Sequence, residues 1–170
     1  GDADFTLHRL AARADDELAN GLGNLVNRVV ALIHRYRDGK PPETPTPTET
    51  GPLDEAIRQA PARIDAALED FDFRSATGAV WTIVDEANRY INRVRPWELA
   101  KTEGADDRLD AVLATLLNTC RTIGDHLEPF LPDAAARIAT QCGTDTDGRI
   151  PAPKPLFRRL ADLVPEGTSR

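Results

Sequence analysis

The strongest constraint on the fold is a run of apolar residues at helical spacing in the second half of the chain. Apolar positions three or four residues apart lie on one face of an α-helix. The run consists of Leu109, Val112, Leu113, Leu116, Leu117, Cys120, Ile123 and Leu127. A helix with such a stripe must bury it against other elements. The pattern therefore predicts one long core helix with partner helices elsewhere in the chain.

Four further segments show the same period and supply those partners. We expect one helix from Thr6 to Arg37 and others over about 53–69, 73–94 and 131–142. Pro61 predicts a kink or a restart within the second of these. Residues that stop or start helices flank the segments, namely Gly39, Pro41, Arg95, Pro96, Pro132 and Gly143. Because no segment alternates in the manner of a strand, the fold class is all-α, a helical bundle of about five helices.

The chain is expected to form a single domain over residues 1–170. Its 170 residues, 41% hydrophobic and 29% charged, suffice for one core. A Pro/Thr-rich loop over 41–52 and a Pro-rich tail over 148–170 interrupt the helical pattern. The first helix has an apolar stripe that later helices must cover, so the loop is expected to lie within the domain. Leu156 and Phe157 are expected to pack back on the bundle.

Apolar runs in the chain are all shorter than the roughly 18 residues of a membrane span, and the polar start has no signal-peptide character. We therefore expect a soluble, cytoplasmic protein without a membrane partner. Cys120 and Cys142 form no Cys-x-x-Cys pair and are predicted to be buried thiols.

Residues that would carry catalysis are not found in the sequence. It contains no Gly-rich phosphate loop, no Gly-x-Ser-x-Gly elbow and no His-Glu-x-x-His pair. His8, His34 and His126 lie far apart, without a second His or Cys at ligand spacing, so surface or capping roles are favoured over metal binding. We therefore predict no catalytic residue, no metal ligand and no cofactor in this chain.

The charge of the chain limits the ways in which it can bind nucleic acid. A formal net charge of −7 disfavours binding that depends mainly on phosphates. Of the 21 basic residues, however, only Lys40, Lys101 and Lys154 are Lys. The others are Arg, a side chain that can also form hydrogen bonds with base edges or stack on bases. Recognition of a few bases therefore remains compatible with the composition.

Polar residues on the first predicted helix form a ridge at the margin of its apolar face. Asn20, Asn24, Arg28 and Arg35 share this ridge when residues are placed 100° apart. Asn and Arg can make paired hydrogen bonds with base edges. Spacing alone favours the alternative that Asn24 and Arg28 satisfy each other or a neighbouring helix end.

Arg95-Pro96-Trp97 places an aromatic residue directly after the end of the third predicted helix. Trp97 is either a plug of the core or, if exposed, a platform on which an unpaired base could stack. Trp81 lies inside the same predicted helix and is expected in the core.

These features also carry a resemblance to a known family. The segment from Leu18 to Arg28, Leu-Ala-Asn-Gly-Leu-Gly-Asn-Leu-Val-Asn-Arg, resembles the helix that opens the anticodon-binding domain of methionyl-tRNA synthetases, which are class I enzymes. Two further matches are Val84–Ile91 followed by Arg95-Pro96-Trp97-Glu98-Leu99-Ala100-Lys101, and the Leu-Glu-Pro-Phe-Leu-Pro of 127–132. The resemblance spans about residues 5–160.

The resemblance implies a module that recognises the CAU anticodon of a methionine-accepting tRNA. By position, the base-reading residues would be Asn24, Arg28 and Trp97, with Trp97 stacking on the first base. Asn20, Arg35, Asn88 and Tyr90 are possible supporting residues, and a structural role is favoured for the last two. The His-Ile-Gly-His and Lys-Met-Ser-Lys-Ser types of signature are absent and the chain has no Met, so it is not expected to activate an amino acid. ATP and Mg would belong to a catalytic domain of the synthetase, which is an expected partner in cis or in trans.

Two alternative functions differ from recognition of an anticodon. A free-standing paralogue could keep the bundle and act as a structural or protein-interaction module through its acidic surface. An independent α-helical enzyme has no constellation of residues to support it.

Overall fold

A computed structural model describes residues 15–43 and 51–157 and confirms the all-α fold. The described elements are a π-helical segment η1 (Asp15–Gly23), five longer α-helices and the single-turn helix α5 (Pro96–Leu99). The longer helices are α2 (Asn24–Arg37), α3 (Pro52–Glu69), α4 (Phe73–Val94), α6 (Asp106–Leu127) and α7 (Pro132–Cys142). No strand occurs within these described ranges.

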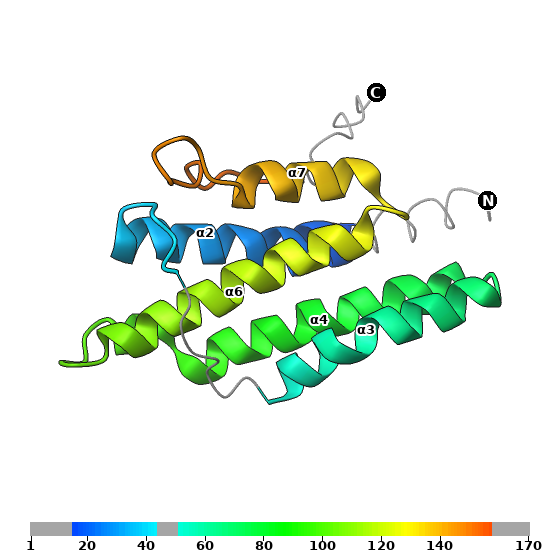
Figure 1. Cartoon of the computed structure of the whole chain (residues 1–170), viewed down its shortest axis with the longest axis horizontal. Helices are drawn as coiled ribbons and strands as arrows, with labels where there is room; N and C mark the ends of the chain where they lie inside the picture. The colour runs from blue at the N-terminus through cyan, green and yellow to red at the C-terminus, as the bar shows by residue number, and fades with distance from the viewer. Residues whose placement is uncertain (1–14, 44–50, 158–170) are drawn as a thin grey trace, which may run out of the picture.

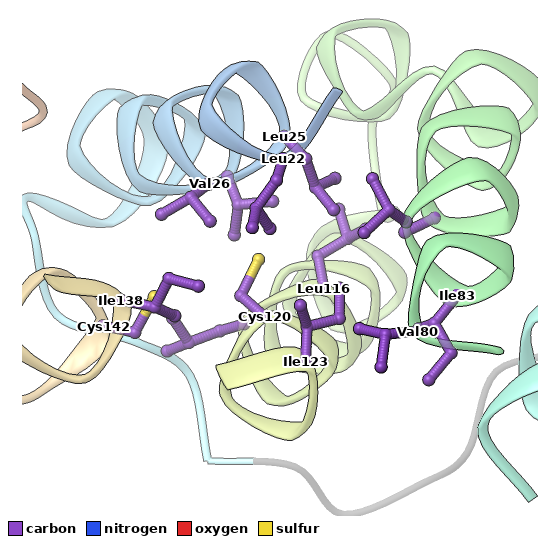
Figure 2. Packing of buried hydrophobic residues seen from close by; sticks show 14 of the residues in the cluster. Leu22, Leu25, Val26, Val80, Ile83, Leu116, Cys120, Ile123, Ile138 and Cys142 are labelled. Atoms are coloured by element: carbon purple, nitrogen blue, oxygen red, sulfur yellow. The ribbon is translucent and has the colours of Figure 1, made fainter. Parts of the chain in front are cut away.

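Helix α6 lies at the centre of the bundle (Figure 1). Helices α2 and α7 lie along one side of it, and the antiparallel hairpin of α3 and α4 lies along the other. The whole predicted stripe of α6 is buried, from Leu109 to Leu127. Residues on its other faces, including Ala114 and Gly124, are buried as well. A close view of the core shows side chains of α2, α4 and α7 gathered around this helix (Figure 2).

The first predicted helix differs from the expectation. Its first part, before Asp15, lies outside the described residues, and residues Asp15–Gly23 are π-helical rather than α-helical. Gly21 and Gly23 weaken the α-helical preference here. Gly23 also accommodates the tail, because a Cβ added to it would lie 3.1 Å from the Phe157 ring. The wider π turn changes the direction in which Asn20 points relative to Arg28, so a 100° wheel no longer places these two on one ridge.

Helix α3 is continuous across Pro61, so Pro61 does not restart the helix, and a kink at this position stays a prediction. Pro61 is exposed, and the helix keeps its buried face through Ala60 and Ile64 on either side of it. Packing of that face against α4 offsets the hydrogen bond that proline cannot donate.

The tail packs on the bundle, as predicted for Leu156 and Phe157. Backbone carbonyls of the tail make several of these contacts. Leu156 is buried, and its carbonyl accepts a hydrogen bond from Arg137 Nη1 at 3.1 Å. At the other end of the tail, the His34 ring Nε2 lies 3.1 Å from the carbonyl oxygen of Ile150. Arg149 contacts the Asp38 carboxylate at 2.8 Å, and this hydrogen bond lowers the Asp38 pKa below its ordinary value.

The two cysteines are buried, as predicted, and their thiols interact between α6 and α7. The hydrogen bond to Cys142 and burial together raise the pKa of the Cys120 thiol, whereas the same bond lowers that of Cys142. Within the described residues there is no group of side chains that could hold a metal ion. None of the described helices is long and apolar enough to cross a membrane.

The close approach of α6 and α7 generates a prediction about stability. A Cβ on Gly124 would lie 3.2 Å from Ile138 Cγ2, whereas one on Gly78 would meet nothing within 4 Å. Gly124→Val should therefore lower the free energy of unfolding by about 1–3 kcal/mol through overpacking. Gly78→Ala should raise it by up to about 1 kcal/mol through helix propensity. Urea unfolding of both variants tests the contrast, and equal effects would contradict it.

Candidate nucleic-acid interface

Arg28 is held between two helices by side-chain amides. Its Nη1 donates to Asn88 Oδ1 at 3.5 Å and its Nη2 donates to Asn92 Oδ1 at 3.1 Å. Asn88 Nδ2 in turn donates to the Val84 carbonyl at 3.1 Å, which directs the oxygen of that amide toward Arg28. The guanidinium is therefore oriented from α4 although it belongs to α2.

The charge of Arg28 is not neutralised by these contacts. Both acceptors are neutral amide oxygens, and no carboxylate of the described residues forms an ion pair with Arg28. A guanidinium has five N–H donors, so others remain available for a ligand. The geometry fixes this side chain in place while leaving it able to bind an acceptor or an anion.

Asn24 lies one turn before Arg28 on α2 and is exposed. Residues four apart in an α-helix are neighbours on one face. No hydrogen bond joins Asn24 to Arg28 in the described structure, so the two do not satisfy each other. Arg28 instead bonds to Asn88 and to Asn92 near the end of α4, in line with the second part of that alternative. Asn20 is exposed in η1, and Arg35 is exposed with its guanidinium 5.6 Å from the centroid of the Tyr36 ring.

Trp97 is the second residue of α5 and follows a sharp turn. Arg95 ends α4 in the left-handed region at φ 52°, and Pro96 then opens α5 and is buried. The Trp97 ring is half-buried and packs against the core, so it has both a supported side and an accessible one. No hydrogen bond to its indole N–H occurs within the described part of the chain.

Arg28 and Trp97 are connected through the end of α4. Asn92, which binds Arg28, lies five residues before Trp97, so their Cα atoms are within about 19 Å of each other, given 3.8 Å between consecutive Cα atoms. This bound limits how far the Trp97 backbone can lie from the residue that holds Arg28.

The other α4 residues differ in their roles. Asn88 has the structural role that was favoured, since it binds Arg28. Tyr90 is only 1% exposed and has the Arg93 guanidinium 5.6 Å from its ring centroid, so it acts as core support. Trp81 is half-buried against the core, in line with its predicted place.

Sequence reasoning missed Asn92. Its spacing of four from Asn88 would have placed the two amides on one face of α4. Nothing in the sequence, however, indicates that this face meets Arg28 of α2. The pairing depends on how α2 and α4 are aligned in the bundle.

Comparison with known proteins decides the family. The family described as the anticodon binding domain of methionyl tRNA ligase matches residues 42–168. The chain belongs to this family. The match covers most of the chain, and the alternative of a free-standing structural paralogue is not favoured.

Individual ligases extend the similarity toward the N-terminus. The methionine–tRNA ligase of Lactococcus lactis is 37% identical over 145 residues, which cover 85% of this chain and 22% of that protein. That of Halalkalibacterium halodurans is 34% identical over 178 residues, covering 94% of this chain and 27% of that protein. The chain thus spans about a quarter of the length of these relatives.

Solved structures share the fold. Mycobacterium tuberculosis methionyl-tRNA synthetase bound by methionyl-adenylate superimposes with a TM-score of 0.80 at 21% identity, over 89% of this chain and 33% of that one. Its free state gives a TM-score of 0.79 at 22% identity. The anticodon-binding-domain fold of the chain is therefore supported by both sequence and structure.

The amide clamp on Arg28 generates a prediction about charge. Asn92→Asp should convert a hydrogen bond into an ion pair and raise the free energy of unfolding by about 0.2–1 kcal/mol at pH 7. Because the ion pair lowers the pKa of the new carboxyl group below its ordinary value of about 3.9, the gain should decline as the pH falls below about 4 and be absent near about pH 2. Thermal unfolding of the variant at both pH values measures the effect. A gain that persists in the Arg28→Ala background would show that the ion pair is not its cause.

Proposed function

We propose that this domain recognises the CAU anticodon of a methionine-accepting tRNA through Asn24, Arg28 and Trp97. The observation that carries the proposal is the Arg28 guanidinium, which two amides of α4 hold in position without neutralising it. Membership in the anticodon-binding family of methionyl tRNA ligase supports the same function.

Arg28 and Asn24 would read base edges in this proposal. A guanidinium binds two acceptors on one base edge, and a carboxamide pairs one donor with one acceptor. Because Asn88 and Asn92 already orient Arg28, little side-chain entropy is lost when a base binds. The exposed Asn24 amide one turn away extends the same edge of α2.

Trp97 would supply a stacking surface for an unpaired base. Its half-buried ring is supported from behind by the core, which keeps one face steady for stacking. Stacking of a base on an aromatic ring contributes roughly 1–3 kcal/mol and does not depend on charge. This suits a chain whose net charge is −7.

The rest of the ligase would supply the chemistry. The relatives are methionine–tRNA ligases, and this chain corresponds to about a quarter of their length. In the proposed arrangement a catalytic domain, in cis or in trans, binds ATP and Mg and activates methionine. This domain contributes the choice of tRNA and no reacting group.

The stacking role of Trp97 can be tested with an anticodon stem-loop that carries CAU. Trp97→Ala should weaken binding about 5- to 150-fold, corresponding to roughly 1–3 kcal/mol, while the slope of log Kd against log salt stays nearly constant. That slope should itself be shallow, because it follows the number of phosphate contacts. Trp97→Phe should retain most of the affinity, and Trp81→Phe serves as the control at a Trp outside the site. Loss of the salt dependence in Trp97→Ala, or unchanged affinity, would contradict stacking.

The base-reading role of Arg28 is tested by specificity rather than affinity alone. Arg28→Ala should weaken CAU binding by roughly 1–3 kcal/mol and reduce discrimination against a stem-loop with one altered anticodon base. Arg63, an exposed residue of α3, offers a matched removal of one positive charge away from the site. If Arg63→Ala weakened binding equally and both variants kept full discrimination, Arg28 would act only through its charge.

A further inference from the structure

Two aromatic residues are exposed at the turn between α3 and α4. Phe71 is 81% exposed and Phe73 is 58% exposed, and they are the exposed large hydrophobic residues among those that the structure describes. Single exposed apolar residues are common, whereas here two aromatic residues within three positions of one turn are exposed. We refer to this pair as the patch. Charged residues surround the pair, namely Glu69, Asp70, Asp72 and Arg74. An apolar centre with a polar rim is the usual composition of a protein interface.

The backbone conformation at Phe71 is energetically unfavourable for a phenylalanine. Its φ of 55° lies in the left-handed region, where Gly or Asn is favoured. The turn itself is made by main-chain hydrogen bonds from Phe71 N to the Leu68 carbonyl and from Asp72 N to the Ala67 carbonyl. Neither bond needs an aromatic side chain. The strain at Phe71 is therefore consistent with a use for its ring outside the bundle.

The hairpin presents the two rings rigidly. Asp72 caps α4 by accepting hydrogen bonds from the Ser75 amide at 3.0 Å and the Ser75 hydroxyl at 2.6 Å. These bonds lower the Asp72 pKa, so the cap is charged at neutral pH. A preorganised aromatic pair loses little conformational entropy when a partner covers it.

The turn between α3 and α4 lies at one end of α4, and α5, which carries Trp97, follows the other end (Figure 1). Phe73 is the first residue of α4, whereas Asn92 is near its end. At 1.5 Å per residue, their separation of about 19 positions along the helix corresponds to nearly 30 Å. The same anticodon loop cannot reach both.

We propose that Phe71 and Phe73 dock this domain onto the catalytic part of the ligase. This inference rests on the proposed function, since it takes the domain as part of such an enzyme. The relatives have about three quarters of their length outside this domain, and this is the part that would cover the two rings. The two rings together expose an area on the order of 250 Å². A standard interface buries about 800 Å² on each partner, so the pair would be its aromatic centre rather than its whole extent.

Hydrogen exchange tests the docking in the ligase that carries this domain, with the separate 170-residue chain as the reference. The peptide over residues 70–76 should exchange at least about tenfold more slowly in the whole ligase. The peptide over residues 101–105, which joins α5 to α6 at the other end, is the internal control and should exchange equally in both. Equal exchange of residues 70–76 would overturn the proposal. Slowing in the separate chain that grows with its concentration would assign the patch to a second copy instead.

Substitutions separate docking from folding. Phe71→Asn should raise the melting temperature of the separate chain by about 1–4 °C, because Asn tolerates the left-handed region. Introduced into the whole ligase together with Phe73→Ser, it should abolish the slowed exchange. Retention of the slowed exchange in this double variant would overturn the proposal. Binding of the CAU stem-loop by the separate chain should not change in either variant, so failure of stem-loop binding would contradict the anticodon proposal without affecting the docking result.

Discussion

The structure depends on the burial of α6 on nearly all sides. The helices around it are amphipathic and bury one face each, and α6 gives those faces a common surface to cover. Small residues allow the closest approach, as at Gly124, where α7 brings Ile138 almost into contact with the α6 backbone. Helices that pack on α6 hold the other features in place. These features are the hydrogen-bonded Arg28, the turn at Trp97 and the packed tail.

The elements of the fold could be predicted from the sequence because their signals are local. The apolar period predicted α6, and the proline at its start predicted α7. Both predictions have bounds close to those of the observed helices. The π-helical segment was not predicted, because the helical period of the sequence does not distinguish a π-turn from an α-turn. The contact of Gly23 with Phe157, which lies more than a hundred residues away, could not be predicted from local sequence either. The continuity of α3 across Pro61 could not be predicted from local sequence either. It depends on the burial of one face of α3 against α4.

The candidate site was predictable only in part, for a similar reason. Arg28 and Trp97 stood out as residue types in suggestive places, and the resemblance gave them roles. What the sequence could not indicate is that Asn92 would meet Arg28, because a contact across 64 positions depends on the alignment of two helices. The finding changes the physical picture of Arg28 from a flexible surface charge to an oriented donor.

Helix α4 runs without interruption from the exposed aromatic turn to the residues that hold Arg28. It contains no proline, and its packing against α3 along its length stiffens it further. An unbroken helix packed against its neighbours resists bending, so the structure favours movement of the two ends of α4 as one body. In the proposed arrangement, an adjustment between the RNA and the catalytic part of the ligase would therefore be a rotation of the whole domain.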